Sequence, residues 1–241
     1  MCKFITPDWP APSSVRAYTT TRNKGYSTSP YGSFNLATNV GDNIEAVIAN
    51  RIALQKALAI PSEPVWLEQV HSTKIIPATT SNIDCQADAS YTNNIEQVCV
   101  ILTADCMPVL FCNQEGTKVA AVHAGWRGLA NGILEKTLQY FDSNVLVWLG
   151  PAIGPQSFEV GKDVYTAFTD FLPQADKAFV STDDDHWLAD LYLLARQRLI
   201  NQGVTTIFGG NFCTYSEPER FYSYRRDKVT GRMASLIWLE E

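Results

Sequence analysis

The alternation of apolar and polar stretches along the chain predicts a series of short strands. Apolar runs of strand length, rich in β-branched residues and bounded by polar breaks, are typical of buried strands. They lie at residues 15–19, 65–70, 97–102, 109–112, 118–122, 145–149, 204–208 and 233–239, with a weaker one at 74–77. Residues 14–41 otherwise form a long polar loop, which in a compact chain is typical of either a disordered or a functional segment.

Four segments show the spacing of amphipathic helices. The first, at 43–59, follows Asp42, and Glu45 comes three residues later in the pattern of a capping box. The others are expected at 129–141, 162–172 and 187–202.

Strands and helices in this order predict an α/β (α+β) fold with a mixed β-sheet and flanking helices. No linker, repeat or shift of composition divides the chain, so residues 1–241 are expected to form a single domain.

Charge and composition exclude several classes of protein. The net charge of −6 and the pI of about 5.1 argue against a nucleic-acid partner and against docking on an anionic membrane, both of which need a basic face. The N-terminus has no signal-peptide pattern, and no apolar run approaches the roughly 18 residues of a membrane span. With six cysteines scattered along the chain, several inside apolar runs, we expect a cytoplasmic protein with free thiols.

Three motifs place a possible metal ligand directly after a predicted strand. They are WLEQVHS with His71, LTADCMPV with Cys106 and AAVHAGWRG with His123. Imidazole and thiolate are the ligands that zinc prefers, and three of them leave a fourth position open for water. No two are close enough in sequence to form a local chelate, so only the fold can assemble the site. Each also has a plain alternative, since His71 could bond only to backbone and Cys106 could be an inert buried thiol.

Several basic residues are candidates for binding an anion. Gly125 and Gly128 allow close backbone approach before the predicted helix, where Arg127 could receive a phosphate or a carboxylate, or could be simply solvated. Near the C-terminus, three arginines flank Asp227 among aromatic residues, in a pattern that suits either anion recognition or a surface ion-pair cluster. These arginines are Arg225, Arg226 and Arg232.

The N-terminal loop and the remaining histidine and cysteines are weaker candidates. Arg22, Tyr31 and Asn35 lie in the loop and could contact a substrate. His186 is expected to be a solvated residue at a helix start. The other cysteines are expected to be structural: Cys85, Cys99, Cys112 and Cys213.

Taken together, these motifs resemble the YfiH-like laccase-domain family. Its members are also called polyphenol oxidases or purine nucleoside phosphorylases, and they include a peptidoglycan editing factor. The matching segments are TTR, SFNLATNVGD, WLEQVH, ADASYT, LTADCMPVLF, AAVHAGWRGLANGI, LGPAIGPQSFEVG and FYSYRRDKVTGRMASLIWL, which cover nearly the whole chain. Where relatives usually read Gly-Gly-Val-Ser after Thr-Thr-Arg, this chain has residues 23–27 as NKGYS, so a role of this segment in substrate binding does not follow from the resemblance.

The resemblance implies a single-domain fold of the YfiH type with a zinc site at His71, Cys106 and His123. It also implies phosphorolysis of adenosine, inosine and S-methyl-5′-thioadenosine, and deamination of adenosine, with a nucleoside and phosphate as partners. For deamination, Asp105 is the first candidate for the proton shuttle and Glu68 the second. For phosphorolysis, the phosphate charge would be met by Arg127, Arg225 or Arg226. The oligomeric state is not predicted.

Three other functions use the same residues. A multicopper oxidase needs many more imidazoles than three histidines provide, although copper in the zinc site could give weak side oxidation. A Cys-His hydrolase, with Cys106 as nucleophile and His123 as base, could remove L-serine from the cell-wall precursor UDP-MurNAc-serine. A structural zinc site would need a fourth protein ligand. The cysteines that could provide it are Cys85, Cys112 and Cys213.

Overall fold

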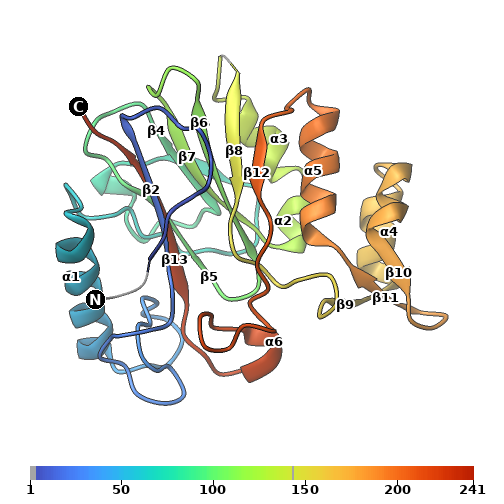
Figure 1. The fold of residues 1–241 in the computed structure, drawn as a ribbon, viewed down its shortest axis with the longest axis horizontal. Helices are drawn as coiled ribbons and strands as arrows, with labels where there is room; N and C mark the ends of the chain where they lie inside the picture. Colours follow the sequence, from blue (N-terminus) through green and yellow to red (C-terminus); the bar gives the residue numbers. More distant parts are fainter. Residues whose placement is uncertain (1–3, 143) are drawn as a thin grey trace.

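The computed structural model describes residues 4–142 and 144–241 and shows a layered α/β architecture (Figure 1). Its centre is a six-stranded sheet with the order β12-β8-β6-β7-β4-β3. Both outer pairs, β12 with β8 and β4 with β3, are parallel, and the inner pairs are antiparallel, so the sheet is mixed as predicted. The strands are β3 (Ile75–Pro77), β4 (Ala89–Thr92), β6 (Met107–Asn113), β7 (Val119–Ala124), β8 (Val145–Leu149) and β12 (Ile207–Gly209).

A second sheet of four strands packs against one face of the first. Its order is β1-β2-β13-β5, with antiparallel pairing throughout. The strands are β1 (Phe4–Ile5), β2 (Val15–Thr20), β5 (Cys99–Thr103) and β13 (Met233–Leu239). Alternate residues of β6 face two different apolar cores. Leu110 and Cys112 pack into the core between the sheets, whereas Val109 and Phe111 pack into the core beneath the helices. This period of two explains why β6 is apolar at nearly every position.

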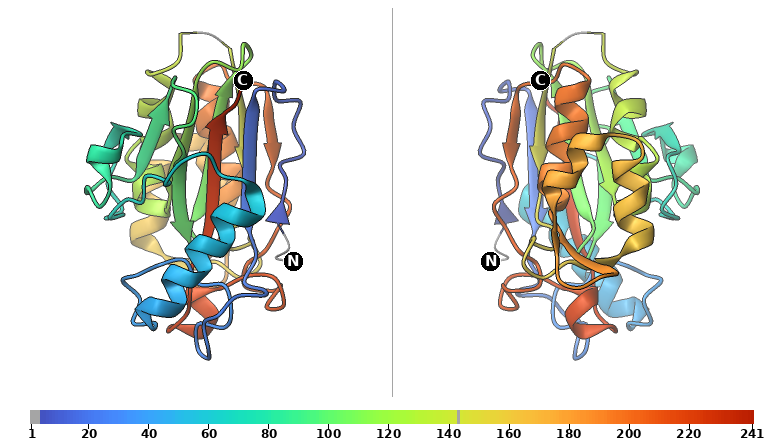
Figure 2. Two further views of the ribbon diagram at one scale, coloured as in Figure 1. Left: turned by 90° about the vertical axis from the view of Figure 1, so that its left-hand side faces the viewer. Right: turned by 90° about the vertical axis from the view of Figure 1, so that its right-hand side faces the viewer.

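Helices cover the two outer faces of this sandwich, as both views of Figure 2 show. On the free face of the six-stranded sheet, α3 and α5 contribute Leu134 and Leu194 to the core. On the free face of the four-stranded sheet, α1 packs Leu54 against Trp238 and its neighbours. The helices are α1 (Ile44–Leu58), α2 (Trp126–Ala130), α3 (Ile133–Leu138), α4 (Lys162–Thr169), α5 (Leu191–Asn201) and α6 (Tyr224–Asp227), with 3₁₀ turns η1 (Thr80–Asn82) and η2 (Pro173–Ala178).

A small third sheet extends the molecule beside α4. It has the order β10-β11-β9 and antiparallel pairing. Its strands are β9 (Glu159–Gly161), β10 (Phe179–Ser181) and β11 (His186–Ala189). The Tyr165 ring of α4 stacks on Trp187 of β11, with ring centroids 4.6 Å apart. Among the described residues, no helix is long and apolar enough to cross a membrane.

Several predicted elements are confirmed and others are wrong in an informative way. The strands at 145–149 and 233–239 match β8 and β13. The strand predicted at 65–70 is absent, with only isolated bridges at Val65 and Glu68. The cause lies in Gln69, whose side-chain amide bonds both the backbone N–H and the carbonyl of Leu102, at 2.8 Å each, in place of a strand ladder.

The helix predicted at 129–141 is in fact two helices. It begins earlier, at Trp126, and Gly132 interrupts it because its φ of +85° is incompatible with a continuous α-helix. The second piece, α3, ends at Leu138.

The boundaries of two more helices differ from the prediction because of their caps. The helix predicted at 187–202 begins only at Leu191, since Asp190 caps it by accepting from the backbone N–H of Leu193 at 2.9 Å. His186 therefore lies in β11 rather than at a helix start; it is exposed, as predicted. The cap of α1 is Asn43 rather than Asp42.

Candidate metal centre and substrate cleft

His71, Cys106 and His123 come together at one point of the structure. One ligand atom from each lies within 4.8 Å of the others, and Cys106 Sγ is 3.8 Å from His71 Nε2. Tetrahedral zinc with bonds of 2.0 to 2.3 Å separates its ligands by about 3.6 Å. The two imidazole rings stand at 71° to each other, so both can direct a nitrogen to a common point. The donor set and its spacing therefore fit a metal ion.

Each ligand is positioned by a different piece of the fold. His123 is the penultimate residue of β7, inside the strand rather than beyond its end as predicted. The β6–β7 register pairs Met107 with Ala124, which brings Cys106, the residue before β6, next to His123. His71 lies in the irregular segment before β3 with a φ of +59°, a conformation that is uncommon for a residue with a side chain.

The buried Asp88 ties two of the ligands together. One carboxylate oxygen, Oδ1, accepts from His123 Nδ1 at 2.8 Å and from the backbone N–H of His71 at 2.9 Å. The other, Oδ2, accepts from the backbone N–H and the hydroxyl of Ser72. With Nδ1 of His123 held by Asp88, its Nε2 is free for a metal, as in other carboxylate–histidine–metal arrangements. The sequence prediction missed Asp88; its only signal was an acidic residue inside the otherwise small and apolar ADAS.

Gly125 leaves the space that the ligands occupy. A Cβ at this position would lie 3.0 Å from Cys106 Sγ and 3.0 Å from His71 Cδ2. Its backbone, with a φ of −64°, is accessible to any residue. The absence of a side chain, rather than backbone freedom, is therefore what the site requires from Gly125.

The charges of the three groups are strongly coupled. Burial raises the pKa of the Cys106 thiol, but His123 and His71 outweigh burial and bring that pKa down to about 6. Burial lowers the pKa of His123, but Cys106 and Asp88 raise it to about 9. Burial raises the pKa of the Asp88 carboxyl, but hydrogen bonds from His123 and Ser72 outweigh burial and keep that pKa below its usual value. Near neutral pH the protein without metal thus holds a Cys106 thiolate beside a His123 imidazolium.

The three ligands lie on a cleft of about 690 Å³. Its walls come from residues 37–40, 66–69 and 102–104, together with Tyr224 and Arg232. In Figure 1 this is the end of the sandwich where α6 and the loop that precedes α1 lie. His71 is exposed, Cys106 partly so, and His123 is 4% exposed, so one side of the ligand set is open to the cleft. A volume of this size accommodates a small organic ligand.

Comparison with known proteins gives a consistent result over the whole chain. The sequence model of a family described as "Multi-copper polyphenol oxidoreductase laccase" matches residues 16–240. A relative in Escherichia coli named "Purine nucleoside phosphorylase YfiH" is 54% identical, over 99% of this chain and 100% of its own. The chain belongs to the YfiH-like laccase family. A "Purine nucleoside phosphorylase" from Haemophilus influenzae is 49% identical over 98% of this YfiH-like chain and 99% of its own.

Solved structures of the YfiH-like family have the same fold. A Neisseria meningitidis protein superposes with a TM-score of 0.95 at 48% identity, covering 99% of both chains. YlmD from Geobacillus stearothermophilus superposes with a TM-score of 0.92 at 30% identity, covering 99% of this chain and 96% of its own. The predicted YfiH-type α/β fold is therefore confirmed.

Asp105 lies next to Cys106 in sequence, but its carboxylate is bonded to the C-terminal segment of this YfiH-like chain. It accepts from the Thr214 hydroxyl at 2.5 Å, the Ser223 hydroxyl at 3.0 Å and the backbone N–H of Arg225 at 2.6 Å. Its side chain is 9% exposed, and it is not among the residues lining the cleft. Glu68, the second candidate for a proton shuttle, is exposed and does line the cleft.

Three predicted anion-binding arginines do not line the cleft. Arg127 is exposed and lies over the Trp126 ring at 4.3 Å. Arg225 donates to the backbone carbonyl of Glu159 at 2.9 Å. The guanidinium of Arg226 is bonded to Asp227 and to three backbone carbonyls, those of Thr214, Tyr215 and Phe221.

The N-terminal candidates also make internal contacts. Arg22 donates to the carbonyls of Gly32 and Pro218, and Tyr31 donates to the carbonyl of Val40 at 2.8 Å. Asn35 is fully buried and bonds Asp42 and the backbone of Ala37 and Arg232. In the divergent segment 23–27, Asn23 donates to the carbonyl of Glu219 at 2.7 Å, and no residue of the segment lines the cleft.

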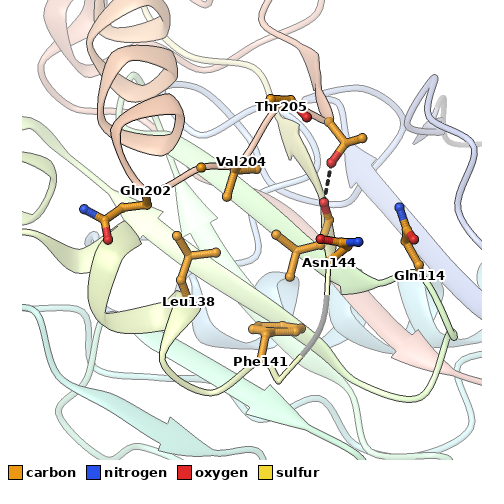
Figure 3. Close-up of a pocket in the computed structure, with 10 residues that line it drawn as sticks. Gln114, Leu138, Phe141, Asn144, Gln202, Val204 and Thr205 are labelled. Carbon is orange, nitrogen blue, oxygen red and sulfur yellow. Dashed lines mark hydrogen bonds between the residues drawn. The ribbon is translucent and has the colours of Figure 1, made fainter.

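Within the described residues, no fourth protein ligand joins the metal candidates. The ligand group contains His71, Cys106 and His123 alone, and it is the only group of three or more such residues there. A separate hollow of about 350 Å³ lies near α3 and β8 (Figure 3). Its described lining, which includes Leu138, Phe141 and Gln202, has no titratable side chain, so it offers no acid–base or metal chemistry.

Proposed function

We propose that the protein is a zinc-dependent purine nucleoside phosphorylase. One observation carries the proposal: three soft and borderline ligands, His71, Cys106 and His123, lie on a cleft large enough for a nucleoside and leave one side of the metal position open. This donor set favours zinc, and an open coordination position is typical of catalytic rather than structural zinc. The names of the relatives in Escherichia coli and Haemophilus influenzae support the same activity.

When bound, the zinc ion would supply a Lewis acid at the floor of the cleft. The chain's own groups do the rest. His71 and Cys106 would hold the metal from one side, and His123 would hold it through Nε2 while Asp88 fixes the ring. Because Asp88 is fully buried, the orientation of His123 is protected from competing water.

In phosphorolysis a phosphate oxygen forms a bond to C1′ of the ribose. The C1′–N9 bond breaks, its electron pair passes to the purine, and the purine takes up a proton. The products are the free base and ribose 1-phosphate. We assign the transfer of this proton to Glu68, an exposed carboxyl group on the cleft wall. Asp105 is occupied by three hydrogen bonds elsewhere, and Asp84, the other exposed carboxyl group on the cleft, acts on the charge of Arg51.

Adenosine deamination by the same site belongs to this proposal as a second reaction. Water would add to C6 of the purine, and ammonia would leave once its nitrogen is protonated. We assign the transfer of this proton to Glu68 on the cleft wall as well. The two reactions differ in their need for phosphate, which makes them separable in one assay.

The test begins with the metal content of the purified protein. We expect about one zinc per chain. Incubation with adenosine should give adenine only when phosphate is present, and inosine irrespective of phosphate. Cys106→Ala should lose both zinc and turnover. Zinc-loaded protein that converts neither adenosine nor inosine would refute the proposal.

One observation favours a second function, that of a Cys-His hydrolase. Without metal, Cys106, His123 and Asp88 form a nucleophile, a base and an orienting carboxylate, with the thiol pKa lowered to about 6. This arrangement would suit the removal of L-serine from UDP-MurNAc-serine. Metal removal separates the two functions: hydrolysis by a free Cys106 thiolate would survive a chelator, whereas a zinc enzyme would lose its activity.

The oxidase chemistry in the family description is not part of the proposal. A blue-copper site takes two histidines and a cysteine, and oxygen-reducing clusters need further imidazoles. The chain has three histidines, and the third, His186, lies in β11 and bonds Asp183. The oxidation that this chain could support is one catalysed by copper bound in place of zinc at the same three ligands.

A further inference from the structure

Two arginines line the cleft that contains the metal ligands, Arg51 and Arg232. Their surroundings differ. The Arg51 guanidinium lies over the Trp66 ring, with Cζ 3.8 Å from the ring centroid, and its Nε donates to the carbonyl of Leu36 at 3.0 Å. Glu63 and Asp84 are close enough to act on its charge. The Nε and one face of the Arg51 guanidinium are therefore already occupied by protein groups.

Arg232 is also held in place, and Cys106 and Asp105 act on its charge without forming an ion pair with it. Its backbone N–H donates to Asn35 Oδ1 at 2.9 Å, and its Nη1 donates to the carbonyls of Thr230 and Gly231. These bonds fix one edge of the guanidinium. Within the described part of the chain, Nε and Nη2 make no hydrogen bond, and no carboxylate forms an ion pair with Arg232.

An arginine in this state is suited to an oxyanion. Its side chain is partly buried, so water compensates the charge only in part. The planar guanidinium offers two N–H donors side by side, which match two oxygens of a phosphate. Neither of these donors is among the buried polar atoms without a partner, so both are open to the cleft and available to a ligand. Arg232 also lies on the same cleft as Cys106 and His123, where the reaction must take place.

We propose that Arg232 binds the phosphate co-substrate, through Nε and Nη2. This inference rests on the proposed phosphorolysis and assigns to Arg232 the role that the sequence suggested for Arg127, Arg225 or Arg226. Phosphate bound there presents one oxygen to C1′ of a ribose lying between Arg232 and the metal ligands. That oxygen forms the new C1′–O bond as the bond to the purine breaks, and the guanidinium stays with the phosphate throughout.

The experiment uses the metal-loaded protein as isolated and compares Arg232→Gln, Arg232→Lys and Arg127→Gln. The last is a matched control, because it removes an exposed arginine outside the cleft. Initial rates give KM separately for phosphate and for adenosine. Calorimetric titration with inorganic phosphate, in the absence of nucleoside, gives a readout that does not depend on turnover.

For Arg232→Gln we expect the phosphate KM to rise about tenfold to a hundredfold, because the variant loses one pair of charged hydrogen bonds to phosphate. The adenosine KM should change by no more than about twofold. Arg232→Lys keeps the charge but loses the two adjacent donors, so its phosphate KM should lie in between. Calorimetric phosphate binding should weaken in the same order, and Arg127→Gln should match the parent protein.

The outcomes separate this inference from the proposed function. A parent protein that cleaves adenosine with phosphate, together with Arg232 variants of unchanged phosphate KM, overturns the inference and leaves the function standing. A parent protein that binds phosphate in an Arg232-dependent way, but never cleaves a nucleoside, overturns the function and keeps the anion site. If Arg232→Gln does not fold, Arg232→Lys decides, and a phosphate KM equal to that of the parent counts against the proposal.

Discussion

Asp88 and His123 contact each other twice, once through the backbone and once through their side chains. The backbone N–H of His123 donates to the carbonyl of Asp88 at 2.7 Å, and His123 Nδ1 bonds the Asp88 carboxylate at 2.8 Å. The first contact fixes the distance between the two residues. The second fixes the rotation of the imidazole ring, so the pair acts as a rigid unit that presents Nε2 to the metal position.

Asp88→Asn should weaken metal binding without changing any ligand. The amide keeps the size of the carboxylate but brings N–H₂ toward groups that are all donors, so His123 loses its fixed orientation. We expect a loss of about 10- to 100-fold in metal affinity, measured by competition with a chromophoric chelator. Ser72→Ala is the control, since it removes one hydroxyl from the same carboxylate and should have a much smaller effect. Equal affinities in the parent and Asp88→Asn would contradict this role.

Gly125→Ala should damage the metal site while leaving the fold intact. The backbone there suits alanine, but the new Cβ would press on Cys106 Sγ and His71 Cδ2 at 3.0 Å. We expect at least about a tenfold loss of metal affinity with a melting temperature close to that of the parent. Gly161→Ala, where the Cβ would meet only the exposed Asp163 carboxylate at 3.2 Å, should retain full affinity.

In the metal-free protein, Cys106 should react with iodoacetamide at unusually low pH. Its pKa of about 6 means that the thiolate forms as the pH rises through 6, well below the range of an ordinary thiol. Peptide-resolved mass spectrometry of a pH series would give the midpoint. Cys99 and Cys112, whose pKa values burial raises to about 12, should stay unmodified in the same samples. Added zinc should protect Cys106, and a midpoint above pH 8 would exclude the thiolate–imidazolium pair.

Asp105→Asn and Glu68→Gln should have opposite signatures. Asp105 joins the segment before β6 to Thr214, Ser223 and Arg225, so its loss should lower the free energy of unfolding by about 3 kcal/mol. Glu68 is exposed on the cleft, so Glu68→Gln should leave stability unchanged and lower kcat. Chemical denaturation and steady-state kinetics of the two variants would separate the roles. A stable Asp105→Asn with reduced kcat would return the proton shuttle to Asp105.

Most of the strands and the three candidate metal ligands were predictable because each carries a local signal. The apolar runs of β8 and β13 need no knowledge of their neighbours, and histidine and cysteine are chemically distinctive wherever they occur. The arginines were not predictable in the same way. Arg226, in α6, and Arg232, just before β13, are six residues apart, and both bond backbone carbonyls. Only the three-dimensional contacts show that Arg226 uses all three of its guanidinium nitrogens, whereas Nε and Nη2 of Arg232 make no hydrogen bond within the described residues.

Asp88 and Gln69 were missed for a related reason. Both use side-chain atoms to satisfy backbone groups far away in sequence, and no periodicity records such a bond. The Gln69 side chain bonds the backbone of Leu102 where a strand ladder was predicted. The Asp88 carboxylate accepts hydrogen bonds from the segment that contains His71.

The two halves of the cleft belong to different sheets. His123 is carried by β7 of the six-stranded sheet, whereas Arg232 directly precedes β13 of the four-stranded sheet. The spacing between the candidate metal ligands and Arg232 is therefore set by how the two sheets pack on each other, through apolar residues such as Leu110 and Ile237. Substitutions in that apolar layer would shift the candidate metal ligands relative to Arg232 without changing any of these residues.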